Sequence, residues 1–144
     1  MIRKATVQDA QTVAALAVKM WPGHPVTELA EEFCALLTKR SVAVFLAMAG
    51  EQAVGFAQCQ LRHDYVEGTE SAPVGYLEGV FVEETHRNDG HAKALLAACE
   101  QWAREQGCSE FASDCELTNT QSLAFHLHCG FREANRIICF TKKL

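Results

Sequence analysis

The chain has 144 residues and a formal net charge of −5, and 49% of its residues are hydrophobic. This length corresponds to a single domain over residues 1–144, and the apolar fraction is too high for a disordered chain. Proteins that bind nucleic acid or anionic membranes need basic surfaces that neutralise phosphates, and no basic run occurs here. We therefore expect neither a nucleic-acid partner nor a membrane partner.

The N-terminus and the cysteines predict a cytoplasmic protein. The chain begins with polar residues rather than an apolar signal segment, and its longest apolar run, 42–49, is too short to cross a bilayer. Seven cysteines is an odd number, so they are read as reduced thiols rather than a disulfide framework. We expect these cysteines to fill the core.

The first quarter of the chain predicts a strand and a helix. A strand over residues 2–7 is followed by a helix that begins with a capping box of Thr6 and Asp9 and runs to about Lys19. Two prolines and a glycine within residues 21–25 then end this helix.

The remaining elements follow in a regular order. A second helix is capped by Thr27, and a helix that starts at Ala92 ends before Gly107. The other predicted elements are a hairpin of strands 42–48 and 54–61, a loop over 62–73, strands 74–82 and 110–114, a helix over 119–129 and a last strand over 137–142. This order predicts an α/β (α+β) fold with a mixed sheet in one domain.

The carboxylates are unevenly distributed. Between Arg62 and Arg87 the sequence has six carboxylates and no Lys or Arg, and between Arg104 and Arg132 it has four more. Two interpretations stay open at this point: solvated loop charge, or a cleft that binds a cation.

The segment Arg87–Ala92 joins a predicted strand to a predicted amphipathic helix. Gly90 lets the backbone approach a ligand closely, and the unpaired N–H groups of a helix start suit a pyrophosphate. Many such junctions carry a glycine for steric reasons alone. The segment is neither a P-loop nor a dinucleotide fingerprint, because the other residues of those motifs are missing.

In this context Arg87, Gly90 and Ala92 match the signature Gln/Arg-x-x-Gly-x-Gly/Ala, and the chain resembles the Gcn5-related N-acetyltransferases (GNAT). The strand that ends at Val82 and the helix that follows Asn119 fit the same family. The resemblance implies a central, mostly antiparallel mixed sheet flanked by helices, and acetyl-CoA as the co-substrate.

Four blocks narrow the resemblance to the short aminoglycoside 6'-N-acetyltransferases. These blocks are Trp21–His24, Arg62–Gly68, Leu77–Phe81 and Phe111–Asp114. The resemblance implies acetyl transfer to the 6'-amino group of aminoglycosides, antibiotic resistance and a homodimer.

The same resemblance assigns binding roles to individual positions. The aminoglycoside would be bound by Trp21, His24, Tyr65, Glu78 and Asp114. Acetyl-CoA would be held by the backbone of Val80, Phe81 and Val82, by the pyrophosphate cradle Asn88, Asp89, Gly90, His91, Ala92 and Lys93, and by Asn119. Because aminoglycosides are polycations, carboxylates suit their binding site.

Two departures from the family pattern bear on these roles. Asp89 brings a negative charge into the expected pyrophosphate turn. Asn135 stands where the subgroup has a substrate-contacting glutamate, so we expect weaker cation binding or an altered drug range at that substrate-binding position.

The chemistry needs a base for the 6'-ammonium and an acid for the leaving thiolate. Glu78, a carboxylate in an otherwise apolar strand, is the candidate base and would act through a water molecule. His126 is the candidate acid, although a packed helical histidine explains it equally well. His126, His128 and Cys129 lack a second ligand pair at zinc spacing, so no metal is expected.

Two alternative functions stay open. One is a GNAT enzyme for another small amine, such as a polyamine or an amino-acid derivative. The other is a non-catalytic acyl-CoA-binding sensor. The blocks around Trp21 and Tyr65 argue against the first alternative, and Glu78 together with the Arg87–Ala92 signature argues against the second.

Overall fold

The computed structural model describes all 144 residues, and its elements alternate much as the sequence predicts. The strands are β1 (Ile2–Lys4), β2 (Val42–Ala49), β3 (Gln52–Arg62), β4 (Val74–Val82) and β5 (Phe111–Ser113). The helices are α1 (Ala10–Met20), α2 (Val26–Leu36), α3 (His91–Glu105) and α4 (Thr120–His128), with 3-10 turns at Val7–Asp9 and Glu84–His86.

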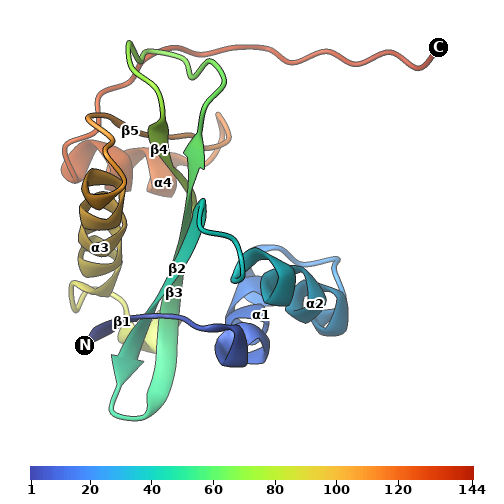
Figure 1. Ribbon diagram of the computed structural model, residues 1–144, viewed down its shortest axis with the longest axis vertical. Coiled ribbons are helices and arrows are strands. Elements are labelled where there is room, and N and C mark those ends of the chain that lie inside the picture. Colours follow the sequence, from blue (N-terminus) through green and yellow to red (C-terminus); the bar gives the residue numbers. More distant parts are fainter.

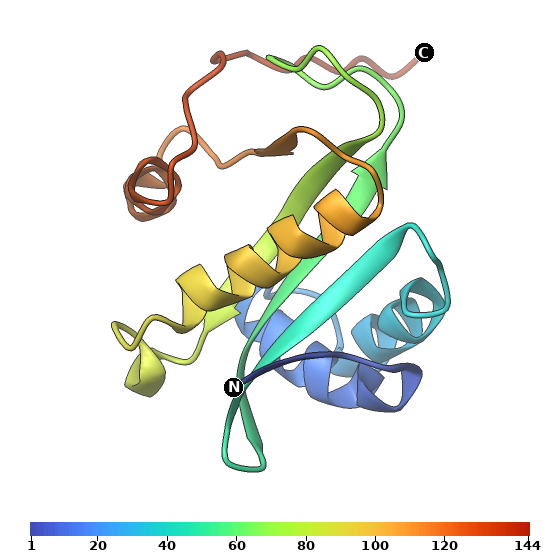
Figure 2. The ribbon, with the colours of Figure 1, turned by 60° about the vertical axis from the view of Figure 1, so that its left-hand side comes forward.

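The five strands form one sheet in the order β1-β2-β3-β4-β5. The first three pairings are antiparallel and only β4 and β5 run parallel, so the predicted mixed, mostly antiparallel sheet is confirmed. Helix α3 covers one face of the sheet, and α1 and α2 cover the other (Figures 1 and 2). The fold is therefore a three-layer α/β arrangement.

Strand alternation supplies a separate core to each face of the sheet. On β3, Phe56 packs with α1 and α2, where its ring meets Phe33 edge to face at 6.3 Å between centroids. Its neighbour Ala57 packs instead beneath α3, in the same core as Trp102, which is 5% exposed. Trp102 is thus the core residue that the helical spacing of α3 predicts.

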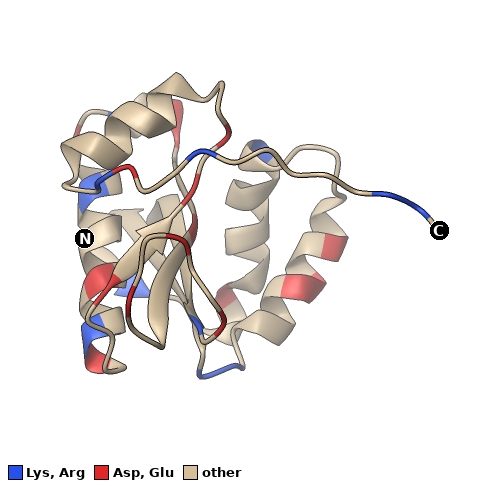
Figure 3. Ribbon diagram, turned by 90° about the horizontal axis from the view of Figure 1, so that it is seen from above, with Lys and Arg blue, Asp and Glu red and all other residues tan.

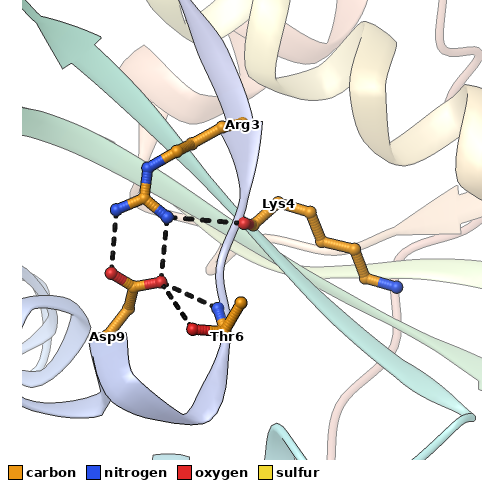
Figure 4. Close-up of polar contacts among 4 residues, drawn as sticks. All are labelled: Arg3, Lys4, Thr6 and Asp9. Carbon is orange, nitrogen blue, oxygen red and sulfur yellow. Dashed lines mark hydrogen bonds and ion pairs between the residues drawn. The ribbon is translucent and has the colours of Figure 1, made fainter.

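The junction between β1 and α1 is held by a carboxylate (Figure 4). Asp9 accepts two hydrogen bonds from the guanidinium of Arg3, at 2.9 and 2.8 Å, and one from the backbone N–H of Thr6 at 2.8 Å. The hydrogen bonds from Arg3 hold the pKa of Asp9 well below its usual value. The predicted capping box is present, but it begins the 3-10 turn Val7–Asp9 rather than α1 itself. Strand β1 is shorter than predicted and ends at Lys4 rather than at residue 7.

The start of α2 differs from the prediction. The capping position is Pro25, whose extended backbone leads into Val26, and Thr27 lies inside the first turn rather than at the cap. Proline is tolerated at this position because the N–H groups of the first helical turn have no intrahelical partner.

The predicted last strand over residues 137–142 is wrong. The chain from residue 131 to residue 144 has no regular structure, and it extends away from the sheet (Figure 1). Ile137, Ile138 and Phe140 are 72%, 81% and 86% exposed. The local pattern is that of a strand, but a strand also needs a neighbour to pair with, and these residues have none within their own chain.

The cysteines fill the core only in part. Cys59, Cys99 and Cys108 are buried, whereas Cys34, Cys115 and Cys139 are exposed, and all seven cysteines of the chain are free thiols. None of the helices combines the length and the apolar composition that a membrane span needs.

Candidate functional site

Strand β4 is irregular at Glu78, and this irregularity creates the site. On β3, Gln58 is opposite Gly79 and Cys59 is opposite Leu77, so Glu78 has no partner and forms a β-bulge. On the other side, the pairing of β4 with β5 ends at Leu77 and Ser113. Beyond that point β4 has a strand neighbour on one side only, and its other edge is open.

The open edge of β4 leads to the start of α3. Gly90 adopts a left-handed backbone conformation with φ of 83° immediately before His91, which is why a glycine is needed there. Arg87 holds this turn against the strand, because its Nε donates to the carbonyl of Val82 at 2.9 Å. The N-terminal N–H groups of α3 therefore lie next to the end of β4.

The residues expected to bind acetyl-CoA fall on these two features and on α4. Val80, Phe81 and Val82 lie on the open stretch of β4, and Asn88–Lys93 form the turn and the first residues of α3. Asp89 is exposed, so its charge is solvated. Asn119 also has a structural role, because its side chain accepts a hydrogen bond from the N–H of Ser122 at 3.0 Å and so caps α4.

Glu78 and Asp114 belong to one polar chain. An oxygen of Glu78 lies 2.8 Å from the guanidinium of Arg62, and this guanidinium stacks 3.5 Å above the ring centre of Tyr76. The hydroxyl of Tyr76 donates to Asp114. Burial and the hydrogen bond to Asp114 raise the pKa of Tyr76 well above its usual value, so this hydroxyl stays protonated.

Trp21 and His24 line a small pocket on the α2 side of the sheet. Its volume is about 200 Å³, and the lining residues include Glu32 of α2 and the buried side chain of Gln58. The six-membered ring of Trp21 contacts β4 at Gly79, where an added Cβ would approach it to 2.8 Å. Gly79 thus leaves room for the indole beside the bulge.

Tyr65 and Asn135 are brought together through a residue that the sequence analysis did not single out. The hydroxyl of Tyr65 donates to Glu67 at 3.0 Å, and the amide of Asn135 donates to the other oxygen of Glu67 at 3.2 Å. All three side chains are exposed. This cluster joins the β3–β4 loop to the C-terminal segment, and it lies apart from the polar chain that links Glu78 to Asp114.

His126 lies on α4 with both ring nitrogens engaged. Nδ1 is 2.7 Å from the carbonyl oxygen of Ser122, and Nε2 is 2.8 Å from the hydroxyl of Ser113. The ring contacts Phe131 edge to face at 5.0 Å between centroids. The orientation of the imidazole is thus fixed toward β5.

Acidic positions are frequent on the elements that carry these clusters. The helix at the right of Figure 3 is α2, which carries Glu28, Glu31 and Glu32, and further acidic positions follow the strands and loops of the site. The surroundings are suited to a positively charged ligand. The structure contains no group of three metal-ligating side chains.

The sequence does not predict several residues that take part in the site. Gln58 gave a readable signal, because it is a polar residue within an apolar strand. Arg62 and Ser113 lie within blocks that carry the family resemblance but have no role assigned from the sequence, and Tyr76 has no such signal. The contacts of all three depend on which strands pair and where the pairing ends.

Comparisons with known proteins give a consistent result. A family model described as "Acetyltransferase (GNAT) family" matches residues 10–131. Two relatives are called "Aminoglycoside N(6')-acetyltransferase type 1". The one from Stenotrophomonas maltophilia is 44% identical over 99% of this chain and 93% of its own length. The one from Salmonella typhimurium is 42% identical over 89% of this chain and 88% of its own length.

Solved structures agree with these relatives. AAC(6')-Iy in complex with the bisubstrate analogue CoA-S-monomethyl-acetylneamine superposes with a TM-score of 0.95 at 39% identity, over 100% of this chain and 98% of the other. AAC(6')-Ih from Acinetobacter baumannii gives a TM-score of 0.93 at 34% identity, over the same shares of the two chains.

Proposed function

Because this chain belongs to the acetyltransferase (GNAT) family, we propose that it transfers the acetyl group of acetyl-CoA to the 6'-amino group of aminoglycosides and so confers resistance. The observation that carries the proposal is the position of Glu78. This carboxylate lies in the bulge where β4 separates from β5, beside the open edge of β4, and the next residue, Gly79, contacts Trp21 of the pocket. A carboxylate there can bind an amine next to an extended acyl donor.

Acetyl-CoA would lie along the open edge of β4. The backbone of Val80, Phe81 and Val82 is free of a strand partner on that side, so an extended pantetheine arm can take the place of one. The N–H groups at Asn88–Lys93 would receive the pyrophosphate at the positive end of α3. Asn119 would contact the coenzyme from the start of α4.

The aminoglycoside would occupy the acidic side of the site. Trp21 and His24 offer an aromatic wall, and Glu78 and Asp114 offer carboxylates for ammonium groups. Tyr65 of the β3–β4 loop and Asn135 of the C-terminal segment would contact the far end of the drug. The substrate must compete with Arg62 for Glu78.

The proposed chemistry is direct transfer. Glu78, acting through a water molecule, takes the proton of the 6'-ammonium, and the free amine attacks the thioester carbonyl. His126 supplies the proton that the departing thiolate takes up. No covalent enzyme intermediate is needed.

Release of CoA tests the proposed function. Neomycin carries a 6'-amino group and paromomycin a 6'-hydroxyl in otherwise matching structures, so we expect release of free CoA from acetyl-CoA with neomycin and none with paromomycin. Binding of acetyl-CoA without release in the presence of any aminoglycoside would instead support an acyl-CoA sensor. Release with a simple polyamine alone would support an enzyme for another small amine.

The proposal extends to the assembly and the compartment. We propose that residues 1–144 form a single cytoplasmic domain that functions as a homodimer, in which residues 137–142 of one copy join the β5 edge of a second copy. The support is twofold: Ile137, Ile138 and Phe140 are exposed, and β5 has a strand neighbour on one side only. Seven free thiols fit a reducing compartment.

The path of the chain favours a partner in a second copy over one in the same copy. Ala134 contacts Gly68, where an added Cβ would lie 2.6 Å from the side chain of Ala134, and Asn135 bonds to Glu67. These contacts direct the following residues outward (Figure 1). The segment therefore leaves its own β5 uncovered.

A further inference from the structure

The hydrogen bonds of His126 define where its protons lie. The carbonyl of Ser122 can only accept, so Nδ1 at 2.7 Å carries a hydrogen. Nε2 faces the hydroxyl of Ser113 at 2.8 Å. When the ring is protonated, both nitrogens donate, and the Nε2 proton points at the oxygen of Ser113. His126 therefore reaches the rest of the site through this hydroxyl.

Ser113 lies at the apex of the opening between β4 and β5. It is the last residue of β5 and is paired with Leu77, after which the two strands separate. The residue that follows Leu77 on β4 is Glu78, the bulge. The hydroxyl of Ser113 thus lies between the candidate acid on α4 and the carbonyl of Leu77, the residue that precedes the candidate base on β4.

The hydroxyl proton of Ser113 is weakly held. With Nε2 donating to it, its own hydrogen can go to the carbonyl of Leu77, which lies at 3.3 Å, beyond the usual distance for hydroxyl donors. A better acceptor that arrives at the apex would take this hydrogen bond. A thiolate formed there is such an acceptor.

We propose that Ser113 is a catalytic residue that passes the proton of His126 to the sulfur of CoA, a role that rests on the function proposed above. As the amine forms its bond to the acetyl carbon, the carbon–sulfur bond breaks and its electron pair stays on sulfur. The second proton of the nitrogen, which must leave for the amide to form, passes to the water molecule beside Glu78, and both nitrogen protons reach solvent by this path. The Ser113 hydroxyl proton moves to sulfur, and the Nε2 proton of the imidazolium replaces it on the oxygen. His126 is left neutral, with Nδ1–H still bonded to Ser122, and takes up a proton from solvent before the next cycle.

Steady-state kinetics of three variants test this relay. We expect Ser113→Ala to lower kcat about 100-fold while the KM values for acetyl-CoA and aminoglycoside stay close to those of the wild type. Ser113→Thr keeps a hydroxyl and should retain most of the activity. Ser109→Ala, an exposed serine just before β5, is the matched control and should behave like the wild type.

A double variant separates a relay from two independent effects. Because both residues act in one proton path, Ser113→Ala combined with His126→Gln should be no slower than His126→Gln alone. Multiplying losses would overturn the relay, as would an unchanged kcat in Ser113→Ala or a Ser113→Thr variant as slow as Ser113→Ala. A wild type that transfers no acetyl group would instead overturn the proposed function, and thermal unfolding of each variant checks that it is folded.

Discussion

At the scale of single residues, the central feature of the site is the ion pair between Glu78 and Arg62. One oxygen lies 2.8 Å from the guanidinium, and the Glu78 side chain is 23% exposed, so water still reaches it. A carboxylate in this position can both hold an ammonium group and accept its proton through water. We therefore propose that Glu78 acts in turnover rather than in acetyl-CoA binding.

This role predicts the result of removing the charge. Glu78→Gln should lower kcat about 100-fold, because the general base is lost, while the Kd for acetyl-CoA changes little. Initial rates and calorimetric titration with acetyl-CoA measure the two quantities. Glu51→Gln, in the exposed turn between β2 and β3, is the control and should leave both unchanged. Equal losses of kcat and acetyl-CoA affinity in Glu78→Gln would contradict the assignment.

At the scale of elements, the β1–α1 junction depends on one carboxylate. The hydrogen bonds from Arg3 lower the pKa of Asp9, so the folded state favours its charged form. The resulting stability is fully present above the unfolded pKa of about 3.9 and is lost as the pH falls below that value toward the folded pKa. The junction is therefore weakened by acid.

Asp9→Asn tests this linkage. We expect the variant to lose about 1 kcal/mol of unfolding free energy at pH 7, because a surface-exposed Arg partner limits the value of the pair. The difference from the wild type should stay constant down to about pH 4 and shrink as the pH falls further toward 2. Urea unfolding at several pH values measures it, and a difference that does not shrink below about pH 4 would show that Asp9 acts by something other than its charge.

Most elements could be predicted because their patterns are local. The apolar spacing of α3 and the run Val74–Val82 each identify their element within a residue or so. Residues 137–142 have an equally clear strand pattern, but whether a strand forms depends on a neighbour elsewhere, and the pattern does not encode one. The strand pattern of residues 137–142 is clear, but no strand forms within the single chain.

For the candidate site, too, the sequence identifies single residues but not the contacts between them. Glu78 stood out as a carboxylate in an apolar strand, and Gly90 as a glycine at a helix start. The bulge at Glu78, its pairing with Arg62 and the contact of His126 with Ser113 all follow from strand register and helix docking. These are properties of the folded arrangement, which one-dimensional spacing does not contain.

At the scale of the whole molecule, the exposed C-terminal segment predicts the assembly. Ile137, Ile138 and Phe140 are large apolar side chains in an extended segment that has no strand partner. Burial of these side chains against a second copy would therefore be favourable. The wild type should therefore be a dimer at micromolar concentration.

Removal of residues 136–144 should convert the dimer into a monomer, as measured by light scattering coupled to size exclusion. Replacing Ile137, Ile138 and Phe140 together by serine should do the same. Replacing Lys142 and Lys143 by glutamine is the control, which should stay dimeric. A monomeric wild type would contradict the proposed dimer, and a dimeric truncated chain would contradict the role of this segment.

The ion pair between Arg62 and Glu78 has a consequence for selectivity. Any amine that reaches Glu78 exchanges one cation for another at that carboxylate, and this exchange by itself yields no net gain. Selectivity among amine substrates must then come from additional ammonium groups that reach other acidic positions, such as Asp114 or Glu32. Arg62 would thus make binding selective for charge number. A molecule with one ammonium group would only replace Arg62 at Glu78, whereas a molecule with several would form further ion pairs and bind more tightly.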